Sequence, residues 1–266
     1  MALKVLSDAR QEFDTALDDI GSNLEFVRAA MQLRPRLRDM LHWQNMDGEA
    51  RKLATRFLDQ GSAEESVFYR GMVISLSGAF EQLVRRVLRD GVRAINEAEG
   101  NYDNLHETLK RQNVYRTGLA LQTIFEPLDY LELDYELLSK NLGTCFVGSP
   151  QAVLNAEAFT IFLSIISPEK LADALNRIGI KMNWDRLGSI QPMREAFETD
   201  KTRETAKAIQ EFLTQFGRKR NKIAHTGSSG VVVNESELEQ LLKFFRVFAR
   251  GLCGLIETEI GTLIPK

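Results

Sequence analysis

Apolar side chains recur at spacings of three and four residues over long segments of this chain, and this periodicity limits what it can fold into. The pattern is typical of amphipathic helices, in which such residues share one face. It is clearest over residues 13–31, 64–95, 202–225 and 234–256. Only six prolines occur in 266 residues, which permits long helices, and the β-prone run 231–233 is too short to build a sheet. The sequence therefore predicts an all-α protein.

Residues that favour helix ends mark two of the boundaries. Ser167 followed by Pro168 is the combination expected at an N-cap and the first helical position, and Gly179 is the expected stop. Asn234 with Glu237 resembles a capping box that opens the last helix. These signals predict a short helix after Ser167 and a long final helix.

The chain is predicted to consist of two parts. Residues 1–60 form an N-terminal helical arm, whose first stripe should end near Pro35 because proline lacks the amide hydrogen that a helix interior needs. Residues 61–262 form a larger helical domain, with an inserted helical region at about 100–200. Within that region, helices are expected near 104–112, 115–125 and 132–140, followed by an ordered loop from Gly143 to Asn155.

Composition excludes several classes of protein. The formal net charge of -3 argues against a protein that coats nucleic acid with its whole surface, so any contact with RNA must be local. Cys145 and Cys253 lie far apart and lack metal or redox spacing, which favours reduced cysteines and a cytoplasmic location. Charged residues near the N-terminus interrupt any export signal, and the longest apolar run, residues 158–166, is too short to span a bilayer. No membrane insertion is expected.

The segment from Arg218 to His225 concentrates positive charge. It holds four fixed cations and one imidazole and no acid. Cations at the end of a helix also complement the helix dipole, so charge alone leaves a purely structural explanation open. The apolar stripe of this helix gives further information about Arg220. One further step of four residues beyond Phe216 reaches Arg220, so this arginine is expected to point toward the packed or partner-facing side. Asn221 and His225 share a face beside it, and the three groups together suit a phosphodiester.

The histidines do not predict a metal site. His42, His106 and His225 have no carboxylate or cysteine at ligand spacing, and the chain has no P-loop or glycine-rich dinucleotide loop. A reaction at Arg220 and His225 is therefore expected to need neither metal nor cofactor.

RNKIAH at 220–225 resembles the R-x4-6-H signature of HEPN domains, in which the position after the arginine is often asparagine. The early helix RGMVISLSGAFEQLVRRVL at 70–88, together with late paired helices, resembles the RiboL-PSP branch of that superfamily over about 60–262. Arg36 to His42 matches the bare spacing too, but leucine follows that arginine. The resemblance implies a HEPN-type helical bundle that dimerises so that two copies of the signature line one cleft.

The resemblance also implies a function and roles for residues. A metal-independent endoribonuclease is expected, in which the 2′-hydroxyl of RNA attacks the adjacent phosphate. His225 acts as acid or base, Arg220 binds the phosphate, and Asn221 positions one of these groups. Glu81 falls at an acidic position of the early helix and is expected to orient Arg220 or His225, although an ordinary ion pair with Arg85 explains it equally well.

Further positive and polar residues are candidates for binding RNA. The residues expected to contact RNA beside the catalytic set are Arg218, Lys219, Lys222 and Thr226. A basic run on the early helix is either a track for the RNA backbone or a solvated helix face; it consists of Arg85, Arg86, Arg89 and Arg93.

The sequence leaves open whether the chain is catalytic and in which system it acts. The chain is either an active nuclease or a non-catalytic HEPN-like dimer that binds RNA, a nucleotide or a protein partner. As a nuclease, it is expected to act as a toxin held by a cognate antitoxin, or as an effector of restriction or phage defence with a defence-system protein as partner.

Overall fold

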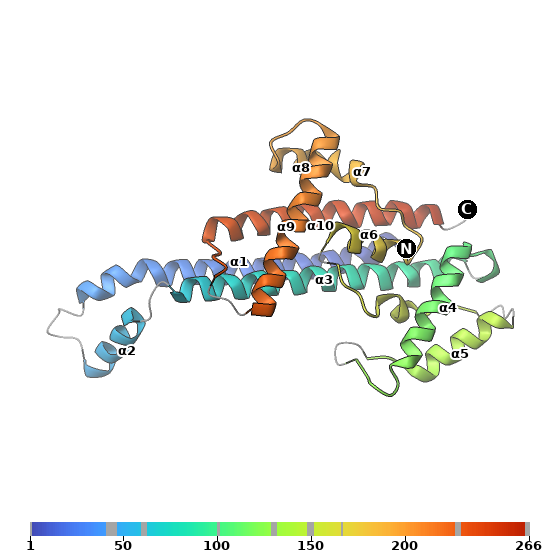
Figure 1. Cartoon of the computed structure of the whole chain (residues 1–266), viewed down its shortest axis with the longest axis horizontal. Helices are drawn as coiled ribbons and strands as arrows, with labels where there is room; N and C mark the ends of the chain where they lie inside the picture. Colours follow the sequence, from blue (N-terminus) through green and yellow to red (C-terminus); the bar gives the residue numbers. More distant parts are fainter. Residues whose placement is uncertain are drawn as a thin grey trace. The chain divides into compact units, whose positions relative to one another are not determined.

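The structure is a computed structural model of the 266-residue chain. It describes residues 2–40, 47–59, 63–99, 102–128, 132–147, 152–165, 167–226 and 230–263. All regular elements in these residues are helical, which confirms the predicted all-α class. Their order is α1 Ala2–Met40, α2 Gly48–Asp59, α3 Ala63–Glu99, η1 Tyr102–Asn104, α4 Glu107–Gln122, α5 Tyr135–Phe146, η2 Ala156–Thr160, α6 Pro168–Asn176, α7 Trp184–Gly188, α8 Gln191–Ala196, α9 Thr202–Thr226 and α10 Glu235–Leu263 (Figure 1).

The chain divides into two compact units. Unit 1 comprises Met1–Phe13, Phe80–Gly217 and Val247–Lys266, and unit 2 comprises Asp14–Ala79 and Arg218–Arg246. This division differs from the predicted boundary at residue 60, which stays a prediction.

The core of unit 1 contains aromatic rings from three helices that contact one another. Phe80 of α3 lies with its ring centroid 6.2 Å from that of Phe13 in α1, edge to face, and 5.8 Å from that of Phe248 in α10. All three side chains are buried. A second apolar cluster joins α4, α5 and η2, and its buried members are Ala120, Leu138, Ala158 and Ile161. The first residues of the chain are therefore part of the core of unit 1.

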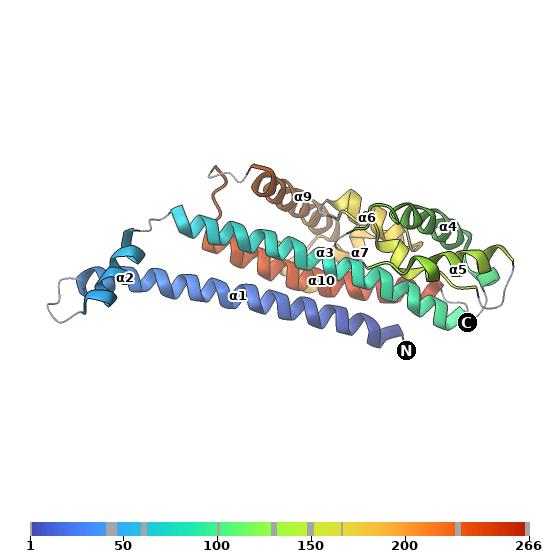
Figure 2. The same ribbon diagram turned by 90° about the horizontal axis from the view of Figure 1, so that it is seen from below.

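Ion pairs join α1 to the start of α10 within unit 2. Arg28 pairs with Glu235 and Glu239, and Arg246 pairs with Asp18. Figure 2 shows these stretches of α1 and α10 running side by side. Most of these side chains are partly exposed, so the ion pairs stabilise the unit only weakly, and the apolar stripe of α1 contributes more.

The predicted caps are confirmed. Oγ of Ser167 accepts a hydrogen bond from the amide of Lys170, and the helix ends before Gly179, whose φ is +79°. Oδ1 of Asn234 accepts from the amide of Glu237 at 2.9 Å, which is the N-cap half of the predicted capping box. The carboxylate of Glu237 pairs with another residue, Lys219 of α9.

Three predicted boundaries were wrong. α1 continues through Pro35 to Met40, and residues 143–146, predicted as loop, are the last turn of α5. A tertiary contact anchors α1 beside Pro35, because Arg34 donates to the carbonyl of Phe57 at 3.1 Å and so binds this end of α1 to α2. The two helices expected over 104–125 are a single helix, α4.

The error in α4 has a physical reason. Two of its four buried positions are polar, and they are Asn113 and Thr117. Oδ1 of Asn113 accepts from the amide of Asn155 at 2.8 Å, and Oγ1 of Thr117 accepts from the side chain of Asn155 at 3.1 Å. The apolar stripe of α4 is therefore interrupted at Asn113 and Thr117, but the helix continues through them. Their polar side chains are hydrogen-bonded to Asn155, which lies 38 to 42 residues away in the sequence.

The predicted apolar face of α3 is confirmed except at its start. Met72, Leu76, Phe80, Leu83 and Val87 are buried, whereas Phe68 is 52% exposed. None of the helices that the structure describes is long and apolar enough to cross a membrane.

Candidate functional site

The signature RNKIAH forms the last turns of α9, in unit 2. Ile223 is its buried residue, and Arg220 is half-buried. Asn221 and His225 are exposed. The stripe of α9 therefore reaches Arg220 as its spacing predicts, and the amide and imidazole stand one turn apart on the solvent side.

Arg220 is oriented by its neighbour. Its Nη1 donates to Oδ1 of Asn221 at 3.2 Å, in an exposed position. Its Nε is buried and has no hydrogen-bond partner within the part of the chain that is described. The stem of the side chain is thus packed, while the outer edge of the guanidinium faces an open surface that an anionic oxygen can approach.

His225 lies in the final turn of α9. Its side chain is exposed, so it can reach a bound substrate. Thr226 is the last residue of the helix; its side chain, together with Gly227 and Ser228, lies outside the described residues.

The other residues predicted to contact RNA differ in how freely their charges can reach a phosphate. Arg218 and Lys222 are exposed on the same helix end. Lys219 is half-buried and paired with Glu237 of α10. Lys219 therefore has to leave a carboxylate before it can bind a phosphate, which makes it the weakest of the three as an RNA contact.

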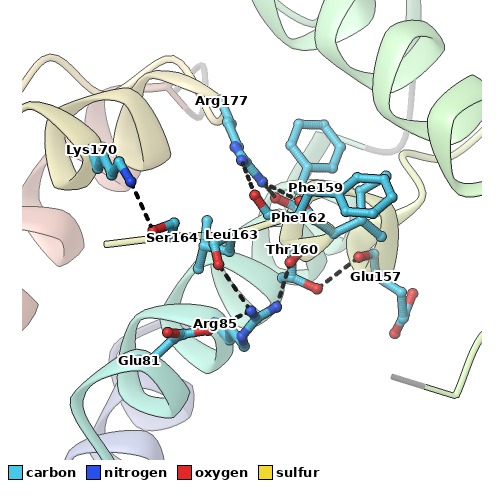
Figure 3. A network of polar contacts seen from close by, with 11 residues as sticks. Glu81, Arg85, Glu157, Phe159, Thr160, Phe162, Leu163, Ser164, Lys170 and Arg177 are labelled. Carbon is cyan, nitrogen blue, oxygen red and sulfur yellow. Dashed lines mark hydrogen bonds and ion pairs between the residues drawn. The ribbon is translucent and has the colours of Figure 1, made fainter. Parts of the chain in front are cut away.

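Glu81 belongs to unit 1 and forms the ion pair with Arg85 that its spacing allows. Its Oε1 accepts from Nη2 of Arg85 at 2.6 Å. Arg85 is buried and donates to the carbonyls of Thr160 and Leu163 as well (Figure 3). Glu81 thus balances a buried cation, and its role toward Arg220 or His225 stays a prediction.

The remaining arginines of the basic run on α3 are also paired. Their partners are Glu12 for Arg86, Asp90 for Arg89 and Glu157 for Arg93. Each charge of the run is therefore matched by an acid from α1, α3 or η2, and its role as a track for RNA stays a prediction.

The described residues contain no group of three histidine, cysteine or acidic side chains placed to hold a metal ion. A pocket of about 450 Å³ lies between α7, α8 and α10 in unit 1, and its lining includes Arg186, Ile190 and Gly254. None of the predicted site residues lines it.

Comparison with protein families gives one match. The family model described as RiboL-PSP-HEPN matches residues 48–258, a range that includes Glu81 and the whole RNKIAH segment. HEPN domains are helical bundles, generally of the RNase type, that often bind RNA and dimerise, so the match indicates an RNA-related role. Neither the curated proteins nor the solved structures gave a match. Because the family model covers most of the chain and includes the signature at the end of α9, this protein belongs to the RiboL-PSP-HEPN family.

Proposed function

We propose that the protein is a metal-independent endoribonuclease that cleaves RNA by attack of a 2′-hydroxyl on the adjacent phosphorus. The observation that carries the proposal is the convergence of Arg220, Asn221 and His225 at the exposed end of α9, with the guanidinium held on the asparagine. The 2′-oxygen forms a bond to phosphorus as the bond to the 5′-oxygen breaks. The products are a 2′,3′-cyclic phosphate and a 5′-hydroxyl.

Each residue has a role that its position supports. His225 is exposed and moves the proton, either from the 2′-hydroxyl or to the departing 5′-oxygen. Arg220 binds the non-bridging oxygens, on which negative charge grows in the transition state. Asn221 holds the guanidinium in position by its hydrogen bond of 3.2 Å.

We include a homodimer in the proposal. The reaction needs a base at one oxygen and an acid at another, and each copy of the signature supplies a single imidazole. Two copies facing one cleft supply both. Phe68, on the predicted apolar face of α3 and in the same unit as the signature, remains 52% exposed and is available to a second copy.

RNA cleavage in the presence of excess chelator tests the reaction. We expect the purified chain to cut single-stranded RNA under these conditions and to leave cyclic phosphate ends, because the proposed groups act without a metal ion. The matching DNA should stay intact, since it lacks the attacking hydroxyl. Arg203→Ala removes an exposed arginine from the first turn of the same helix and is the control for Arg220 variants. Cleavage that depends on added divalent metal, or equal cleavage of DNA, contradicts the proposal.

Light scattering tests the dimer. The chain is expected to be dimeric at micromolar concentration, and Phe68→Asp should shift it to a monomer because a carboxylate cannot be buried unpaired in an interface. Phe125→Asp is the control, since Phe125 is 91% exposed and belongs to unit 1. A monomeric parent protein that cleaves RNA at full rate excludes the shared cleft.

The finer biological role is proposed on the resemblance alone. An RNase of this kind suits a toxin restrained by a cognate antitoxin, or an effector of phage defence. If the cleavage assay is negative while RNA still binds, the non-catalytic HEPN-like binding dimer replaces the nuclease.

A further inference from the structure

The segment that follows η2 in unit 1 is held by two buried arginines. Nη1 of Arg177 donates to the carbonyls of Phe159 and Ile161 at 2.9 and 2.8 Å, and Nη2 donates to that of Phe162 at 3.3 Å (Figure 3). Arg85 binds the carbonyls of the two remaining residues of the stretch 159–163. Five consecutive carbonyls are thus bound by guanidinium groups, so the backbone of this segment is fixed.

This fixed segment presents Phe162 to solvent on a strained backbone. Its φ is +48°, in the left-handed region that a side chain disfavours, and it is 51% exposed. The neighbouring residues Ile161 and Leu163 are buried. The fold therefore holds the backbone of Phe162 in an unfavourable conformation, in which its aromatic ring is exposed to water.

Helix α4 packs beside this segment, because Ile161 lies in one apolar cluster with Ala120 of α4. The pKa of Arg177 is lowered to about 10, first by burial and then by the nearby charges of Arg116 and Arg85. Arg116 stands one turn before Ala120 on the same face of α4, and Arg177 itself binds the carbonyl of Phe162. The carboxylate of Asp173 raises the pKa of Arg177, but its effect is smaller than that of the two arginines.

A second exposed ring stands beside Arg116 on α4. Tyr115 is 57% exposed, and the guanidinium of Arg116 lies over its ring, 5.0 Å from the centroid. Its hydroxyl also acts on the charge of Arg177. Exposed rings interleaved with guanidinium groups form the combination on which unpaired bases stack while phosphates are bound.

We propose that Phe162, Tyr115 and Arg116 form a binding site for single-stranded RNA, with bases stacked on the two rings and a phosphate on the arginine. This site is separate from the signature on α9. The proposal rests on the proposed function only because it takes RNA as the ligand. It captures a single-stranded stretch of the substrate and favours unpaired over duplex RNA, because a paired base has no free face to stack.

Fluorescence anisotropy tests this site with the full-length chain carrying His225→Ala and a short labelled single-stranded RNA of mixed sequence. Phe162→Gly should weaken binding about tenfold, the effect of losing one stacked base, and Phe162→Trp should preserve it. Glycine also relieves the strain at φ +48°, so the melting temperature of Phe162→Gly should stay equal or rise. Phe125→Ala, which removes another exposed ring of unit 1, should leave binding unchanged.

The charge is tested separately by the dependence of affinity on salt. Arg116→Gln should reduce the slope of log affinity against log salt by about one, and Arg116→Lys should restore it, as expected for a phosphate contact. An unchanged slope in Arg116→Gln, or equal binding of duplex RNA, overturns the proposal. Unchanged RNA binding in Phe162→Gly accompanied by loss of the dimer also overturns it and assigns the ring to a protein interface. These are binding measurements, so their failure is distinct from a failure of the parent protein to cleave RNA.

Discussion

Replacing His225 by alanine or Arg220 by methionine should lower the rate of RNA cleavage by at least about a hundredfold, the effect of removing a general acid or base or a group that stabilises transition-state charge. The folded state should be unaffected. His225 is exposed, and the one hydrogen bond that the described residues show for Arg220 goes to its own neighbour, Asn221, in an exposed position. Methionine matches the packed stem of Arg220 and leaves no buried charge, so the melting temperature should be equal or slightly higher.

Single-turnover cleavage and thermal unfolding of the same preparations measure both effects. Arg203→Ala and His42→Ala should retain the parental rate; Arg203 is exposed on the same helix, and His42 lies outside the described residues. If Arg220→Met lowers the free energy of unfolding by about 3–5 kcal/mol, as expected for breaking a buried ion pair, Arg220 has a structural role. The binding dimer then becomes the better interpretation.

Truncating Phe80 to alanine should lower the free energy of unfolding by about 3–5 kcal/mol. Its ring is buried between those of Phe13 and Phe248, so the substitution leaves a cavity that three helices share. Urea denaturation of the full chain measures the loss. Phe125→Ala removes the same ring from a position that is 91% exposed, and its effect should stay within about 0.5 kcal/mol.

The result for Phe80 also bears on the N-terminal arm. Phe13 belongs to the same aromatic cluster and is equally buried, so Phe13→Ala should also be costly in the same assay. A negligible effect of both substitutions contradicts a core that includes the first residues of the chain.

Much of the fold was predictable from local pattern. The stripes of α3, α9 and α10, the cap at Ser167 and the cap at Asn234 depend on residues within one or two turns of one another, and the structure confirms them. Prediction failed where distant contacts override local preference. α1 continues past Pro35 at the point where Arg34 binds α2, and α4 is continuous because Asn155 satisfies its buried polar side chains. The helix propensities of single residues take no account of these two long-range contacts.

The candidate site divides in the same way. The sequence by itself determined that Arg220, Asn221 and His225 stand at one helix end, because residues one, four and five positions apart on a helix have fixed relative directions. Only the tertiary structure decided that Lys219 is held by Glu237, 18 positions away, and that Arg85 binds a carbonyl 78 positions away. It also decided that Phe162, part of an ordinary apolar run in the sequence, stands exposed on a strained backbone. The physical reason is that a buried guanidinium binds whichever carbonyls the packing of distant segments brings to it, and no local spacing encodes which segments those are.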